Sequence, residues 1–155
     1  MSETLKAKDA ALTYLGYAPT TERRVRDKLA GKGFAGEVID EVIADLVRVG
    51  LLDDEAYARE FAKQLSQKET AGARWIETKL VSRGIQYSLA ARVAEEFGAE
   101  GSDAALEAAR ARVAKMGHVT DEEKLVRRLA GQLQRRGFGA GEAFEAARQA
   151  SKERE

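Results

Sequence analysis

The 155-residue chain contains no cysteine and a single histidine, His118. The lack of cysteine excludes disulfides, thiolate metal sites and cysteine nucleophiles, and one histidine excludes any site that requires two. We therefore expect no bound metal or cofactor, and a reducing, cytoplasmic environment. Also missing are an apolar run of the ~18 residues that a membrane helix needs and the apolar centre of a signal peptide. We expect no membrane partner.

The chain has no excess of either charge, with 26 basic and 26 acidic residues. This balance argues against a protein that acts only by attraction to phosphates. Proline occurs once, at Pro19, and β-branched residues form no alternating run. Hydrophobic residues make up 44% of the chain, enough for a packed core, and the commonest residue types favour helices. The composition predicts an all-α fold.

Three segments repeat one pattern around the glycines Gly33, Gly84 and Gly137, which are 51 and 53 residues apart. Apolar residues stand eight and four positions before each glycine and one position after it. They are Val25, Leu29 and Phe34 in the first copy, Ile76, Leu80 and Ile85 in the second, and Leu129, Leu133 and Phe138 in the third. A glycine between a basic and an apolar residue is typical of a left-handed helix end. The pattern predicts two helices joined at each glycine.

A third amphipathic helix is expected before each pair, over residues 3–15, 53–66 and 102–115. The chain is thus predicted to form three tandem three-helix repeats, stacked into an elongated, curved array with a continuous core. The repeats are expected to cover residues 1–50, 51–100 and 101–155. The predicted helix starts are, in chain order, Thr20, Asp53 or Asp54, Ser102, and Thr120 with Glu123 as a capping box.

Several motifs resemble chemical sites, but each has a simpler structural interpretation. The sequence from Gly31 to Gly36 matches a G-x-G-x-x-G dinucleotide pattern, yet a helix precedes it where that motif requires a strand. The acidic run from Asp53 to Glu55 could bind a cation, or it could cap a helix. His118 has no nucleophile or acidic partner suggested around it, so we predict no enzyme activity.

Basic residues recur on one face of the second helix of each repeat. The densest group is Lys124, Arg127, Arg128 and Arg135, and no acidic residue occurs between 124 and 136. Such a face could simply be exposed to solvent, but ordinary solvated faces carry charges of both signs. The single sign of charge here favours a binding surface. The predicted partner-binding residues are Arg24, Lys28, Lys32, Trp75, Lys79, Arg83, Lys124, Arg127, Arg128, Arg135 and Arg136. Trp75 either anchors the partner or packs against a neighbouring repeat.

Two segments share a K-L-x-x-[KR]-G-[FI] pattern, Lys28-Leu-Ala-Gly-Lys-Gly-Phe34 and Lys79-Leu-Val-Ser-Arg-Gly-Ile85. Between them lies Gly50-Leu-Leu-Asp-Asp-Glu-Ala-Tyr-Ala58. In their order and spacing these segments resemble the RecX family of regulators of the RecA recombinase. The resemblance implies a non-enzymatic protein that lies in the groove of RecA filaments on DNA and suppresses ATP hydrolysis and strand exchange. It also implies contact with single- or double-stranded DNA.

The residues alone leave other functions open. A three-helix unit with a basic second helix also describes helix-turn-helix DNA-binding proteins, although the acidic residues Asp121, Glu122 and Glu123 would repel phosphates. A helical adaptor is a further alternative. Because the net charge is zero, we expect weak binding to bare DNA, and we expect a monomer.

Overall fold

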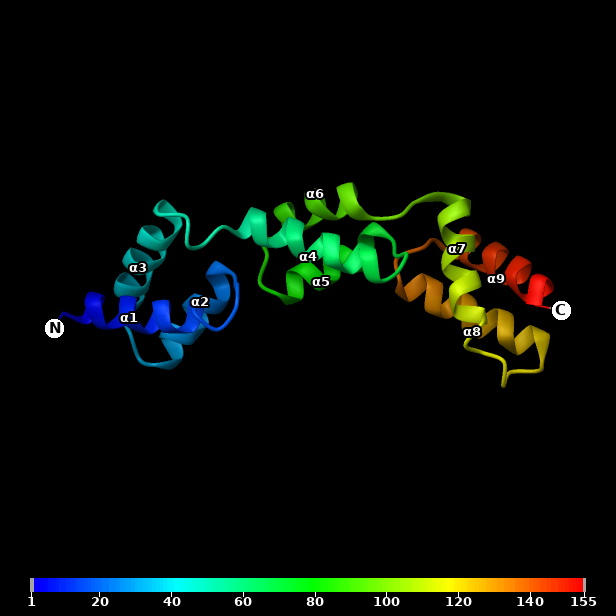
Figure 1. The fold of residues 1–155 in the computed structure, drawn as a ribbon, viewed down its shortest axis with the longest axis horizontal. Coiled ribbons are helices and arrows are strands. Elements are labelled where there is room, and N and C mark those ends of the chain that lie inside the picture. The colour runs from blue at the N-terminus through cyan, green and yellow to red at the C-terminus, as the bar shows by residue number, and fades with distance from the viewer. Residues whose placement is uncertain (1, 155) are drawn as a thin grey trace.

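A computed structural model describes residues 2–154 of the chain. Within this range there are nine α-helices and no β-strand, as the sequence predicts. From the N-terminus the helices are α1 (Glu3–Leu15), α2 (Glu22–Gly31), α3 (Gly36–Arg48), α4 (Asp54–Lys68), α5 (Ala73–Ser82), α6 (Tyr87–Phe97), α7 (Gly101–Val113), α8 (Glu122–Arg135) and α9 (Ala140–Arg154). They form three groups of three, which follow one another along an elongated molecule (Figure 1).

Each group of helices closes a hydrophobic core of its own. The apolar faces of α1, α2 and α3 enclose one cluster, those of α4, α5 and α6 a second, and those of α7, α8 and α9 a third. The predicted continuous core is therefore wrong, because the apolar stripe of each helix is already covered within its own group. Leu52 is buried in the first cluster although it follows the predicted boundary at residue 50. The repeat boundaries stay a prediction.

The three repeated glycines end α2, α5 and α8 as the sequence predicts. Their φ angles are +92° at Gly33, +96° at Gly84 and +93° at Gly137, a region that L-amino acids rarely adopt. After the first glycine, the N–H of Phe34 donates to the carbonyl of Leu29 at 3.2 Å, and the same bond recurs in the other copies. This pattern is a Schellman motif, which turns the chain sharply into the third helix of each group.

The starts of the helices follow the sequence only in part. Asp53 caps α4 as predicted, since its Oδ1 accepts from the backbone N–H of Ala56 at 3.0 Å. The predicted starts at Thr20, Ser102 and Thr120 are wrong. The N-cap positions belong instead to Thr21, Glu100 and Asp121, one or two residues away. Within residues 2–154, no helix is both long and apolar enough to cross a lipid bilayer.

Candidate partner-binding surface

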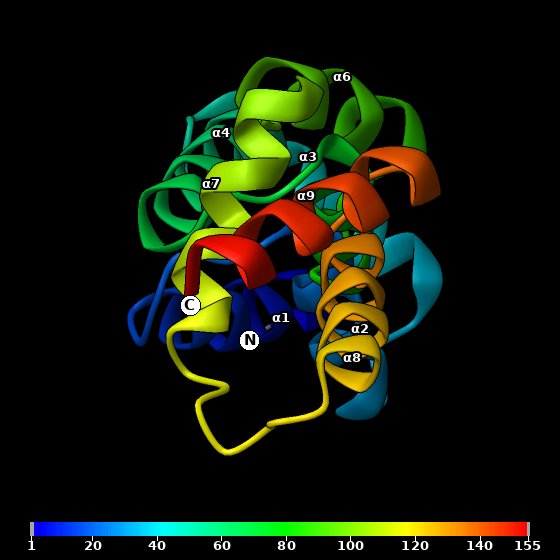
Figure 2. The same ribbon diagram turned by 90° about the vertical axis from the view of Figure 1, so that its right-hand side faces the viewer.

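The second helices of the three groups stack end to end. The Oγ1 of Thr21, at the start of α2, donates to the carbonyl of Arg83, at the end of α5, over 2.9 Å. The N–H of Gly72, at the start of α5, donates to the carbonyl of Arg136, at the end of α8, over 2.6 Å. Seen along the molecule, α2 and α8 lie one behind the other (Figure 2). We call α2, α5 and α8, with their C-caps, the second-helix column.

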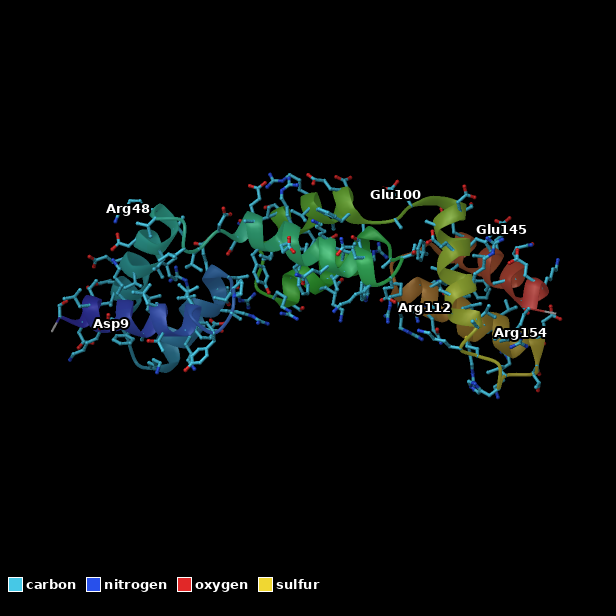
Figure 3. All side chains as sticks on the ribbon, viewed as in Figure 1. Asp9, Arg48, Glu100, Arg112, Glu145 and Arg154 are labelled. Atoms are coloured by element: carbon cyan, nitrogen blue, oxygen red, sulfur yellow. The ribbon has the colours of Figure 1, made fainter. Side chains whose placement is uncertain are left out.

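The column concentrates positive charge, although the net charge of the whole chain is zero. Residues 22–32, 73–83 and 122–136 contain 13 of the 26 basic residues but only five of the 26 acidic ones. The column therefore carries a net charge of +8, balanced by negative charge elsewhere. Arg48 and Glu100 lie on the opposite edge of the molecule from α2 and α8 (Figure 3).

Most of the predicted binding residues are exposed on this column. None of these exposed residues forms an ion pair with another residue in the range 2–154. They are Arg24, Lys28, Lys32, Lys79, Lys124, Arg127, Arg128 and Arg135. Because no carboxylate pairs with these cations inside the molecule, they can attract an acidic partner without first breaking an ion pair.

The two arginines that precede Gly84 and Gly137 are half-buried and make contacts inside the molecule. The guanidinium of Arg83 lies 4.5 Å from the ring centre of Phe61. The Nε of Arg136 donates to Oε1 of Glu69 at 2.8 Å. These contacts hold both side chains against the protein, and a contact of either with a partner stays a prediction.

Trp75 is half-buried at the junction of the second and third groups. The Arg136 guanidinium lies 4.9 Å from its ring centre, and the Lys79 ammonium lies 5.5 Å from it. A cation over an indole face is stabilised by the ring quadrupole. Because Arg136 belongs to the third group and Trp75 to the second, the geometry favours packing between neighbouring groups, one of the two predicted roles.

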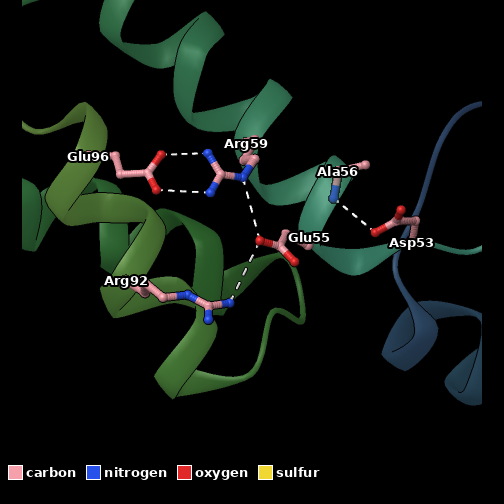
Figure 4. Close-up of polar contacts among 6 residues, drawn as sticks. All are labelled: Asp53, Glu55, Ala56, Arg59, Arg92 and Glu96. Atoms are coloured by element: carbon pink, nitrogen blue, oxygen red, sulfur yellow. Dashed lines mark hydrogen bonds and ion pairs between the residues drawn. The ribbon is translucent and has the colours of Figure 1, made fainter.

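The acidic run at the start of α4 is used for capping and ion pairing. Asp53 caps the helix, while a Glu55 carboxylate oxygen lies 3.6 Å from Arg59 and 3.9 Å from Arg92 (Figure 4). Arg59 also forms a two-pronged contact with Glu96, and this hydrogen bonding lowers the pKa of the Glu96 carboxyl. Among the described residues, no group of three acidic or histidine side chains is arranged to hold a metal ion.

The sequence reasoning missed the residues that join the groups. These are Thr21, Gly72, Glu69 and Arg112. A signal existed for one pair, because Thr21 and Gly72 both stand 12 positions before the repeated glycine of their copy. No pattern of charge or hydropathy marked Glu69, which stands at the end of α4 outside the repeated segment.

Comparison with known proteins shows the family to which this chain belongs. A family model described as the first three-helix domain of RecX matches residues 7–46. The chain is 30% identical to "Regulatory protein RecX" of Corynebacterium efficiens over 149 residues, which cover 93% of this chain and 71% of the relative. It is also 30% identical to the protein of the same name from Prosthecochloris aestuarii over 138 residues, 88% of each chain. The chain belongs to the RecX family.

The fold of solved RecX proteins agrees with this assignment. The crystal structure of RecX from Lactobacillus salivarius superposes with a TM-score of 0.77 over 97% of both chains, at 21% sequence identity. The RecX-like segments Lys28–Phe34 and Lys79–Ile85 form the C-terminal parts of α2 and α5 with their left-handed glycines. The two segments that carry the resemblance thus lie where the column turns into α3 and α6.

Proposed function

We propose that this protein is a non-enzymatic regulator that binds RecA filaments on DNA and lowers their ATP hydrolysis and strand exchange. The proposal rests on membership of a family whose relatives are named as regulatory proteins. The observation that carries it is the second-helix column, whose exposed cations extend through all three groups of helices.

A long, repeated partner suits a surface of this kind. Cations distributed along an elongated molecule can contact several subunits of a filament together, and the separate weak contacts then add up to useful affinity. Such contacts need no base-specific geometry, because phosphates and acidic side chains both attract lysine and arginine. The zero net charge of the chain favours a partner made of protein and DNA over DNA alone.

The experiment reverses two charges on the column. In Arg127→Glu/Arg128→Glu we expect about tenfold weaker binding to RecA filaments at low salt, a loss that shrinks near about 0.5 M salt. Neither residue belongs to the buried stripe of Leu125, Leu129 and Leu133, so thermal stability should be unchanged. Binding is measured by fluorescence anisotropy, together with RecA ATP hydrolysis.

A matched control places the same charge change elsewhere. Lys63→Glu/Lys152→Glu alters two exposed lysines of α4 and α9, which form no ion pair within residues 2–154. Equal losses from both double variants would indicate a net-charge effect and would remove the column from the site. Sequence-specific DNA binding with unchanged RecA activities would replace the proposal by the helix-turn-helix alternative.

A further inference from the structure

The junction between the second and third groups is fastened by one carboxylate. Glu69, just after α4, accepts from Nη2 of Arg112 on α7 at 2.6 Å and from Nε of Arg136 at the end of α8 at 2.8 Å. All three side chains are between 21% and 31% exposed, which reduces screening by water and salt. Arg136 in addition covers the ring of Trp75. Glu69 therefore ties one group to two different helices of the next.

The junction between the first and second groups has no such fastening. It contains the bond from Thr21 to the Arg83 carbonyl and a 3.0 Å bond from the Glu22 N–H to Oδ1 of Asp54. No ion pair crosses this junction within residues 2–154. The difference follows from one position. Glu69 stands three residues before Gly72, the N-cap of α5, and the residue three before Thr21, the N-cap of α2, is Ala18.

The side chain of Arg83 has no carboxylate to bind across the first junction and contacts its own group instead. It turns back onto its own group, where it lies over Phe61 and its Nη1 donates to the hydroxyl of Tyr57 at 3.4 Å. Its counterpart Arg136 instead reaches across its junction to Glu69. The same repeated arginine therefore joins two groups at one junction and stays within one group at the other.

The connecting segments differ in the same direction. Between the second and third groups, the Ala99 N–H donates to the Ala71 carbonyl at 2.8 Å, and a Cβ on Gly98 would lie 2.5 Å from the backbone of Ala73. This segment is therefore packed against the start of α5. Between the first and second groups, the N–H groups of Leu51 and Leu52 donate back to the Leu46 carbonyl, and Leu52 is buried in the first cluster. This segment is thus held to the first group, and none of its hydrogen bonds within residues 2–154 reaches the second, whereas Ala99 bonds to the second group and packs against the third cluster.

We infer that the second and third groups form one rigid body and that the first group pivots on it where the chain passes from Leu52, in the first core, to Asp53, the N-cap of α4. The three hydrophobic cores are separate, so the stiffness of each junction depends on its polar contacts. At the second junction, both hydrogen bonds of Glu69 join a carboxylate to a guanidinium. At the first, only the bond to Asp54 involves a charged group. Because charge-assisted bonds are the stronger ones, the second junction should resist bending more. The cations of α5 and α8 are then held at fixed spacing, whereas Arg24, Lys28 and Lys32 move together as a separate arm.

The test measures the spread of distances across each junction in the full-length protein. Because the chain lacks cysteine, pairs of introduced cysteines can carry nitroxide labels for double electron–electron resonance. Ala44→Cys with Ser88→Cys spans the first junction, and Ser88→Cys with Glu145→Cys spans the second. All three positions are exposed and helical. We expect a distance distribution about twofold broader across the first junction. Equal widths would overturn the inference.

Three variants test the cause of the difference. Glu69→Gln should broaden the distribution across the second junction without changing the first, and Arg112→Gln, which removes one of the two ion pairs, should broaden it part of the way. Ala18→Glu supplies Arg83 with a carboxylate and should narrow the distribution across the first junction. Circular dichroism confirms that each variant is folded. An unchanged second junction in both Glu69→Gln and Arg112→Gln, or an unchanged first junction in Ala18→Glu, would overturn the role given to the carboxylate. RecA is absent from these measurements, so their outcome is independent of the proposed function.

Discussion

The two junctions of the second-helix column make the same contact with different atoms. At the first, a threonine hydroxyl at the start of α2 reaches the carbonyl end of α5. At the second, the backbone N–H of Gly72 makes the bond, and a Cβ there would lie 2.5 Å from the carbonyl oxygen of Gly137. A side chain therefore acts as a spacer at the first junction, and its absence permits backbone to touch backbone at the second. Similar repeats can thus be joined at different distances by changing one residue.

The largest effect is expected from Gly72→Ala. The added methyl group meets Gly137 backbone atoms at 2.5–3.0 Å, and backbone cannot move aside as a side chain can. Overpacking costs about 1–3 kcal/mol or more, and a clash with three backbone atoms puts the expected loss at or above the upper end of this range. The measurement is the free energy of unfolding in urea, combined with the distance distribution across the second junction.

Gly31→Ala is the matched control, because nothing lies within 4 Å of a Cβ at that helical position. Replacement of an exposed helical glycine by alanine should stabilise the protein by about 0.5–1 kcal/mol. If Gly72→Ala were as stable as Gly31→Ala, close backbone contact would not be what distinguishes the second junction.

The next largest effect is expected from Gly84→Ala. Comparison with Gly33→Ala separates the cost of backbone strain from the cost of a clash between groups. Gly33→Ala and Gly84→Ala both force alanine to φ above +90°, which costs roughly 1–2 kcal/mol. Around Gly33 there is open space, whereas a Cβ on Gly84 would lie 2.9 Å from Oγ1 of Thr21. We expect Gly84→Ala to be less stable than Gly33→Ala by about 1 kcal/mol in thermal unfolding. Equal losses would mean that the first junction gives way without cost.

A smaller loss is expected from Thr21→Val, which preserves shape but removes the hydroxyl. The change breaks the bond to Arg83 and the N-cap bond from the Arg24 N–H, at a cost of about 1–2 kcal/mol. Thr20→Val is the control, because its buried Oγ1 has no hydrogen-bond partner among the described residues. Removal of an unpaired buried hydroxyl should be neutral or stabilising. A greater loss from Thr20→Val than from Thr21→Val, in chemical unfolding, would contradict this assignment.

The smallest effect concerns the pH dependence of the first junction. Burial, followed by the nearby Asp54 carboxylate, raises the pKa of Glu22 in the folded state. The folded protein therefore holds this proton more tightly than the unfolded chain, and the ionised carboxylate costs stability at neutral pH. Glu22→Gln should stabilise the protein at pH 7 by less than about 0.5 kcal/mol, an advantage that disappears as the pH falls through the raised pKa. Urea unfolding at pH 7 and pH 4 measures the change, and an advantage that grew toward pH 4 would have the wrong sign.

The sequence predicted the features that depend on neighbouring residues. The glycines that end α2, α5 and α8 follow from their spacing to buried residues such as Leu29, and these contacts lie within one helix and one turn. The start of α2 was misplaced because Thr20 and Thr21 have equal capping chemistry, and only the Arg83 carbonyl, 62 residues away, selects Thr21. The position of Trp75 on its helix was predicted, but the residue facing it belongs to another group. Contacts between groups have no local signal in the sequence.

The three separate hydrophobic clusters also have consequences for folding. Each closes with contacts no more than about 50 residues apart in the chain, and such short-range contacts favour fast folding. Eight of the fifteen buried members of the third cluster are alanines, three on α7, one on α8 and four on α9, whereas the first cluster is built mainly from valine, isoleucine and leucine. Alanine buries less apolar area than these larger side chains, so the third cluster gains less per residue from leaving water. In native-state hydrogen exchange we expect its amides to open at a lower free energy than those of the first, as a cooperative unit of their own.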